Sequence, residues 1–107
     1  MDWHITTQQV ADFSAMSGDF NALHTSEHAA QQAGFTRPIA HGMLLMALAE
    51  GAWQQHFGTQ PAYIDCRFLR PVFVPATLHV TLTKQQLQAS CNGELVIHII
   101  FQKELDE

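Results

Sequence analysis

Residues 41–58 read HGMLLMALAEGAWQQHFG, and this stretch decides the fold. The pattern predicts a helix that begins near His41 or Gly42 and reaches about His56, where Gly58 stops it. Its first two turns, residues 43–49, are apolar on every side. Because a helix without a polar face has to be enclosed on all sides, the rest of this small domain is expected to wrap around it.

The second half of the chain is expected to supply the sheet. Alternating apolar and polar residues predict strands over about 62–69, 78–83, 87–91 and 95–101. Asn92 and Gly93, between the last two strands, form a strong hairpin signal. The sequence therefore predicts an α+β protein in which an antiparallel sheet wraps around one long apolar helix, as in the hot-dog fold.

The last predicted strand has two apolar faces. One is expected to carry Leu95, Ile97, Ile99 and Phe101, and the other Val96, His98 and Ile100. A second apolar face, on a strand whose first face already meets the core, suggests contact with another subunit.

The first half of the chain is expected to be helical. A helix is predicted over residues 8–17, because Gly18 stands where a glycine commonly ends one. Ser26 is a suitable N-cap for a short second helix, which Gly34 is expected to end. Residues 19–25 form an irregular segment between the two helices.

Length and composition favour a single domain over residues 1–107. Apolar residues make up 47% of the chain and charged residues only 14%, so some apolar surface is expected to be covered by a second subunit. The net charge of −5 argues against non-specific nucleic-acid binding, because such binders need a basic surface.

The sequence gives no sign of a membrane or secreted protein. The longest apolar run, residues 43–49, is far shorter than the roughly 20 residues that a membrane-spanning helix needs. The first residues lack the features of a secretory signal. Cys66 and Cys91 form no CxxC motif, so neither a redox pair nor a zinc site is expected. A reduced, soluble, cytoplasmic protein is the resulting expectation.

Residues 17–43 read SGDFNALHTSEHAAQQAGFTRPIAHGM. This segment resembles the MaoC-like hydratases, the family of the (R)-specific enoyl-CoA hydratases, whose motif runs approximately S-G-D-x-N-P-x-H-x-D and continues later with I-A-H-G-M. The matching residues are Ser17, Gly18, Asp19, Asn21, His24, Ile39, Ala40, His41, Gly42 and Met43. Weaker similarity covers nearly the whole chain. The resemblance implies the hot-dog fold, a homodimer, and no metal or other cofactor.

The resemblance also implies a reaction. Water would add across the 2,3 double bond of a trans-2-enoyl thioester of CoA or of an acyl-carrier protein, giving an (R)-3-hydroxyacyl thioester, and the reverse would be a dehydration. Asp19 and His24 would hold and deprotonate the water and return the proton to the α-carbon. Gly42 lies in the first helical turn, where N–H groups have no helical partner, and its N–H would stabilise charge on the thioester oxygen.

Other residues of the motif receive supporting or binding roles. Asn21 is expected to orient the loop or the histidine, and His41 to have a structural or hydrogen-bonding role. Arg37 flanks the motif and is a candidate for contacting a substrate phosphate, although a solvated loop charge explains it equally well. Met43, next to Gly42, is placed among the substrate-binding residues.

The sequence departs from the family pattern at Ala22, which replaces a proline, and at Glu50, where hydratases often carry a serine. Another hot-dog group, the acyl-CoA thioesterases with an H-G-G…D/E pattern, has its catalytic carboxylate at about this position, although Met43 replaces the second glycine here. Glu50 is therefore a base for thioester hydrolysis, a partner of Asp19 or His24, or the polar residue where the helix leaves the core.

Three functions follow from these alternatives. The first is the hydratase, the second a hot-dog thioesterase that uses Glu50, and the third a non-catalytic module that binds acyl thioesters. Intact Asp19, His24 and Gly42 argue against the third, because a module without turnover has no need of all three.

Overall fold

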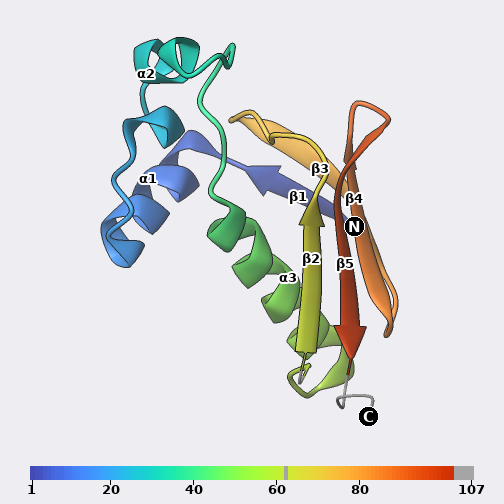
Figure 1. Ribbon diagram of the computed structural model, residues 1–107. Coiled ribbons are helices and arrows are strands. Elements are labelled where there is room, and N and C mark those ends of the chain that lie inside the picture. The colour runs from blue at the N-terminus through green and yellow to red at the C-terminus, as the bar shows by residue number, and fades with distance from the viewer. Residues whose placement is uncertain (62, 103–107) are drawn as a thin grey trace.

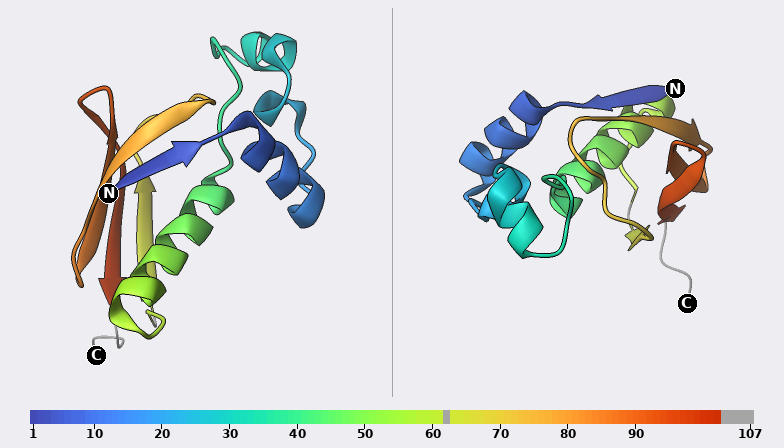
Figure 2. Two further views of the ribbon diagram at one scale, coloured as in Figure 1. Left: turned by 180° about the vertical axis from the view of Figure 1, so that it is seen from behind. Right: turned by 90° about the horizontal axis from the view of Figure 1, so that it is seen from above.

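The computed structural model describes residues 1–61 and 63–102, so Ala62 of the predicted first strand and the end of the predicted domain, residues 103–107, lie outside it. Five antiparallel strands form one curved sheet in the order β1-β3-β4-β5-β2, with helix α3 against its inner face (Figures 1 and 2). The strands are β1 (Asp2–Ile5), β2 (Tyr63–Phe68), β3 (Ala76–Leu82), β4 (Gln86–Cys91) and β5 (Glu94–Gln102). The architecture is the predicted α+β arrangement.

Helix α3 spans Gly42–Phe57, as the opening stretch of sequence predicted, and ends at Gly58 in the left-handed conformation (φ 72°). Its buried side chains are Leu44, Leu45, Ala49 and Trp53. They pack on the inner face of the sheet, whose fully buried residues include Leu78, Leu87, Ile97 and Ile99. This helix and sheet contribute most of the hydrophobic core.

The expectation that α3 is enclosed on all sides is wrong for this chain. Met43 is 66% exposed, and Ala47 and Glu50 are also exposed. The sheet curls around only one side of the helix, as the view from above shows (Figure 2). The first turns of α3 therefore have an apolar face that the sheet does not cover.

Leu45→Ala tests how far the contact between helix and sheet stabilises the fold. Leu45 is 2% exposed, so its truncation is expected to lower the free energy of unfolding by about 2–5 kcal/mol. Met43→Ala on the exposed side of the same helix should change it by no more than about 0.5 kcal/mol. Denaturant unfolding followed by circular dichroism measures both, and equal changes would contradict this view of the core.

The N-terminal strand β1 was not predicted. Its four residues pair with β3 in antiparallel register, with Trp3 opposite Leu78. The strand has only four residues, and only Ile5 among them is fully buried. A pattern this short does not show a detectable alternation of apolar and polar residues in the sequence. Pairing with β3, which is remote in sequence, is what holds it in place.

The predicted faces of β5 are wrong at its first residues. Ser90 pairs with Leu95 and Ala89 with Ile97, so Val96 is an additional residue at a β-bulge. The bulge buries Val96 (4% exposed) and turns Leu95 outward (37% exposed). The outer face therefore carries Leu95 in place of Val96, together with Ile100 (37% exposed), and His98 between them contacts the Gln86 side chain (Nε2 to Oε1, 2.9 Å).

Two further helices lie beyond one end of the sheet, where they flank the start of α3 (Figure 1). Helix α1 (Thr7–Ser17) has Thr6 as its N-cap, whose hydroxyl accepts the Gln9 N–H (3.0 Å), and Gly18 as its C-cap (φ 79°). Helix α2 (Glu27–Gln32) is capped by Ser26, as predicted, and its C-cap Ala33 is followed by Gly34 in the left-handed conformation (φ 94°), also as predicted. Among the described residues, no helix is long and apolar enough to cross a membrane.

Candidate active site

The loop after α1 is shaped by the side chains of its own polar residues. Asp19 Oδ1 accepts the backbone N–H of Asn21 (3.2 Å). Asn21 Oδ1 in turn accepts the N–H of Leu23 (3.2 Å) and caps the short 3₁₀ helix η1 (Ala22–His24). Asp and Asn commonly stabilise turns in this way. Asn21 therefore lies where it can orient the loop, and the loop brings Asp19 and His24 together.

One hydrogen bond fixes the tautomer of His24. Its Nδ1 lies 2.7 Å from the carbonyl oxygen of Ile39. Because a carbonyl only accepts, Nδ1 carries the proton, and Nε2 of the neutral ring keeps a free lone pair. Nε2 is 3.8 Å from Asp19 Oδ2, which is too far for a direct hydrogen bond and suits a bridging water.

A second histidine lies directly against the first. His41 is buried, and its ring stacks on that of His24 with centroids 3.8 Å apart and planes inclined by 25°. Its Nε2 lies 3.0 Å from Ser14 Oγ on α1, and Phe13 packs beside it. Burial, followed by the proximity of His24, lowers the pKa of His41, while the nearby backbone of Asp19 and then its charge act in the opposite direction. His41 is therefore neutral at pH 7.

Sequence reasoning did not identify Ser14. It occupies a position on the same face of α1 as Val10, and both side chains are buried. A serine among the buried positions of a helix calls for a polar partner, and this was the available signal. The partner, His41, lies 27 residues away in sequence and could not be inferred from spacing.

The donor atoms of Asp19, His24 and His41 lie within 4.8 Å of one another, which raises the question of a metal. A zinc ion would have to lie about 2.0–2.1 Å from each nitrogen and near the plane of each ring. The two rings are stacked and nearly parallel with centroids 3.8 Å apart, so their in-plane lone pairs cannot both point at an ion only about 2.0–2.1 Å from each nitrogen. The arrangement suits a water molecule better than a metal.

Gly42 lies in the first turn of α3, one residue after His41. His41 is the N-cap but makes no side-chain capping bond, and the Gly42 N–H has no partner among the residues the structure describes. A Cβ at Gly42 would lie 3.1 Å from the Phe68 ring. The missing side chain thus leaves a free backbone donor that another molecule can approach closely.

Residues 38–40 connect this helix start to the loop. The Ile39 N–H donates to the carbonyl of Leu23 (3.2 Å), on the loop side. The Ala40 N–H donates to the carbonyl of Val72 (2.8 Å), in the connection between β2 and β3. One short segment therefore connects the loop that carries Asp19 and His24 (residues 19–25, the acid–base loop), the start of α3 and the β2–β3 connection.

A cleft of about 340 Å³ opens beside Gly42. Ile39, Ala40 and Leu45 line one wall, and Phe68, Leu69 and Val72 are among the residues of the other. Met43 does not line it. Arg70 also lines this mostly apolar cleft, whereas Asp19 and His24 do not; clefts with a mostly apolar lining are typical of small-molecule sites.

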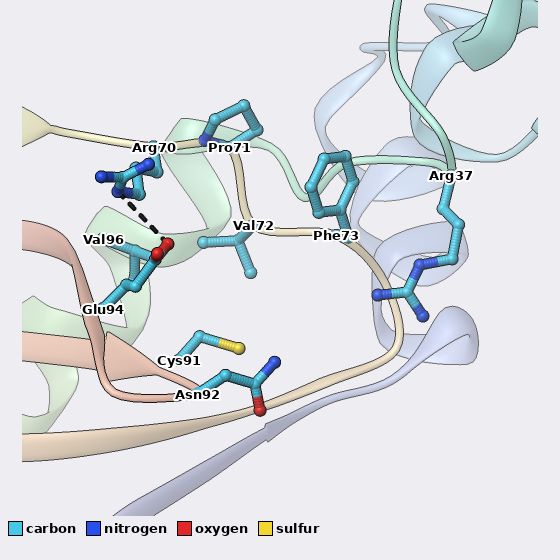
Figure 3. Close-up of a pocket in the computed structure, with 9 residues that line it drawn as sticks. All are labelled: Arg37, Arg70, Pro71, Val72, Phe73, Cys91, Asn92, Glu94 and Val96. Carbon is cyan, nitrogen blue, oxygen red and sulfur yellow. Dashed lines mark ion pairs between the residues drawn. The ribbon is translucent and has the colours of Figure 1, made fainter.

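Arg37 lines a neighbouring pocket of about 280 Å³ (Figure 3). Its guanidinium lies 5.8 Å from the centroid of the Phe73 ring. In the same pocket Arg70 Nε lies 3.4 Å from Glu94 Oε2, as the dashed line shows. Arg70 also lines the cleft beside Gly42, so the two hollows adjoin.

Glu50 is not brought to the site. It lies eight residues after Gly42, which places it about 12 Å further along the helix at 1.5 Å per residue. Its side chain is exposed, and within the described part of the chain it makes no hydrogen bond or ion pair. Of its three possible roles, this placement favours the polar residue where the helix leaves the core.

A curved antiparallel sheet around a central helix, with an aspartate and a histidine beside the helix start, defines a hot-dog domain of the dehydratase kind. The chain belongs to the MaoC-like domain family, whose model matches residues 1–100. The resemblance found in the sequence is thereby confirmed.

The relatives are hydratases and dehydratases. The chain is 44% identical over 69 residues to the (R)-specific enoyl-CoA hydratase of Aeromonas caviae, covering 62% of this chain and 52% of that protein. It is 37% identical over 73 residues to 3-hydroxyacyl-thioester dehydratase X of Mycobacterium tuberculosis, covering 68% of this chain and 26% of that protein. The chain thus spans about half, or less, of the length of these relatives.

Two solved structures have a similar fold. HtdX of M. tuberculosis superposes with a TM-score of 0.83 at 26% identity, covering 95% of this chain and 46% of that one. The (R)-hydratase of A. caviae, described as involved in PHA biosynthesis, gives a TM-score of 0.73 at 29% identity. The match covers 94% of this chain and 88% of that one. These matches confirm the hot-dog fold.

Proposed function

We propose that this domain adds water to trans-2-enoyl thioesters of CoA or of an acyl-carrier protein, giving (R)-3-hydroxyacyl thioesters, and catalyses the reverse dehydration. The observation that carries the proposal is the pair formed by Asp19 Oδ2 and His24 Nε2, 3.8 Å apart, with the free lone pair of His24 fixed by Ile39. The relationship to an (R)-specific enoyl-CoA hydratase supports it.

The reaction follows from these positions. A water held between Asp19 and His24 gives up a proton to this pair, and its oxygen forms a bond to C3 of the enoyl group. The electrons of the double bond move toward the thioester oxygen, where the Gly42 N–H and the positive end of the α3 dipole stabilise the charge. The proton then passes to C2, and the net change is the addition of one water.

The two hollows suggest where the substrate lies. The apolar cleft beside Gly42 would take the acyl chain, and Arg37 in the adjoining pocket would contact a phosphate of the carrier. Met43 is exposed on the open face of α3 and would contact the substrate only outside the cleft. A homodimer and a cytoplasmic location belong to the same proposal, and the exposed apolar residues Phe68 and Leu69 at the cleft support a dimer.

The test is direct. The purified protein is mixed with a short trans-2-enoyl-CoA, the enoyl absorbance is followed, and a thiol reagent is used in parallel. Loss of absorbance without thiol release is the expected result. Thiol release would favour a thioesterase, and silence in both assays, also with a longer chain and with carrier-bound substrate, would favour the binding module.

Glu50→Gln separates the hydratase from the thioesterase. The exposed position of Glu50, remote from Gly42, predicts that hydration by the variant stays within about twofold of wild type, as for surface substitutions away from a site. No thiol should be released by either protein. A loss of thiol release in the variant alone would identify Glu50 as a hydrolytic base.

A further inference from the structure

His41 has one ring nitrogen that the fold leaves without a partner. The side chain is 2% exposed, and its Nε2 contacts Ser14, but the buried Nδ1 has no hydrogen bond within the described residues. A buried polar atom without a partner is costly, and most such atoms in folded proteins are satisfied by protein or water. The Asp19 backbone lies close enough to raise the pKa of His41 but makes no hydrogen bond to Nδ1, which therefore calls for a further partner.

The groups around His41 indicate which nitrogen carries its proton. His41, Asp19 and His24 each contribute a donor or acceptor atom to the cluster within 4.8 Å. The carboxylate of Asp19 accepts only, and His24 presents the lone pair of Nε2, because its Nδ1 donates to Ile39. Because Ser14 engages Nε2 of His41, Nδ1 is the nitrogen left for these two acceptors, and they favour a proton on it. Ser14 Oγ then donates its hydrogen to Nε2.

The cluster is also the right size for one oxygen atom. Any three atoms within 4.8 Å of one another can be reached from a single point at no more than about 2.8 Å (4.8/√3), which is a hydrogen-bond distance. One water at such a point would donate to Asp19 and to His24 and accept from an N–H of His41. Its second lone pair would remain free to attack.

We infer that Ser14 holds His41 as the Nδ1–H tautomer and that this N–H is a third contact to the reacting water, which it orients between Asp19 and His24. The inference rests on the proposed hydration reaction. Ser14 is a positioning residue that acts through His41. Three contacts fix the direction of the water's free lone pair, which two contacts leave free to rotate.

The tautomer can be measured without turnover. In protein carrying ¹⁵N-labelled histidine, the ¹⁵N shifts and couplings of the two ring nitrogens of His41 show which one is protonated at pH 7. A protonated Nδ1 and an unprotonated Nε2 are expected. The opposite tautomer would overturn the inference, even if the protein proved to be an active hydratase, and the expected tautomer would stand even if hydration failed.

A matched pair of variants tests the contact to water. Asparagine can place an N–H near the position of Nδ1, whereas leucine has nearly the same shape and no donor. His41→Asn should therefore keep a kcat within about tenfold of wild type, and His41→Leu should lose about 10²-fold, the effect typical of removing one preorganised donor. KM should change by no more than about threefold in both.

Ser14→Ala is the milder variant. It removes only the hydroxyl that anchors His41, so kcat is expected to fall about tenfold with KM nearly unchanged. Ser90→Ala, which removes a half-buried hydroxyl from β4 outside the site, should have no effect. Equal activity of His41→Asn and His41→Leu in folded protein, or unchanged kcat in Ser14→Ala, would show that the pair is only structural.

Discussion

Asp19→Asn is expected to slow the hydration of a trans-2-enoyl thioester by about 10²–10⁴-fold, the range that general acid–base groups contribute. Asparagine keeps the shape of the side chain and the oxygen that accepts the Asn21 N–H, so the loop should retain its conformation. It cannot take a proton from the water. Because the side chain of Asp19 is 52% exposed, the loss of its charge should leave stability nearly unchanged. The initial rate of loss of enoyl absorbance measures the effect.

The matched control is Asp12→Asn. Asp12 lies exposed on α1, where its carboxylate accepts a hydrogen bond from Gln8 Nε2 (2.8 Å). The substitution makes the same change in net charge outside the site, and its rate should stay within about twofold of wild type. If Asp19→Asn were as active as this control, Asp19 would have no part in the chemistry.

His24→Ala should have an effect of the same size, about 10²–10⁴-fold, because it removes the lone pair that receives the proton. Alanine also removes the hydrogen bond to Ile39 and the stacking on His41, so a second variant is needed. His24→Asn can keep an N–H near the position of Nδ1 for the Ile39 carbonyl, yet it has nothing at the position of Nε2. Both variants should be nearly inactive, measured as kcat with unfolding temperatures alongside.

Two comparisons make this result decisive. His28→Ala, an exposed histidine on α2, should retain wild-type activity. The double variant Asp19→Asn, His24→Asn should be little slower than the slower single variant, because groups that act on one water are not additive. Recovery of activity in His24→Asn would reduce His24 to a structural residue, and losses that multiply would show that the two groups act in separate steps.

Local signals in the sequence were enough to predict much of the fold. The bounds of α3, the N-cap Ser26 and the C-cap Gly18 depend on residues within one turn of the helix ends, so they can be predicted without tertiary structure. The bulge that buries Val96 depends instead on how β5 registers against β4. Strand β1 likewise depends on a partner more than 70 residues away.

The candidate site also has parts that the local sequence predicts and parts that depend on the folded chain. Asp19 and His24 lie on one short loop, so their proximity follows from the motif. The contact of His24 with Ile39, and that of Ser14 with His41, join elements that only the folded chain brings together. The enclosure of α3 was mispredicted because the apolar pattern shows that a helix face is apolar and does not show whether this chain covers it.

The hydrogen bonds of residues 38–40 have a consequence for how the site meets its substrate. The acid–base loop and the β2–β3 connection bond to this segment through Leu23, His24 and Val72, and the chain runs directly from it into the first turn of α3. Their relative positions are therefore set when the chain folds and do not wait for a ligand to assemble them. In the proposed hydration, a site of this kind would have little reorganisation left to undergo as charge develops, which would lower the barrier.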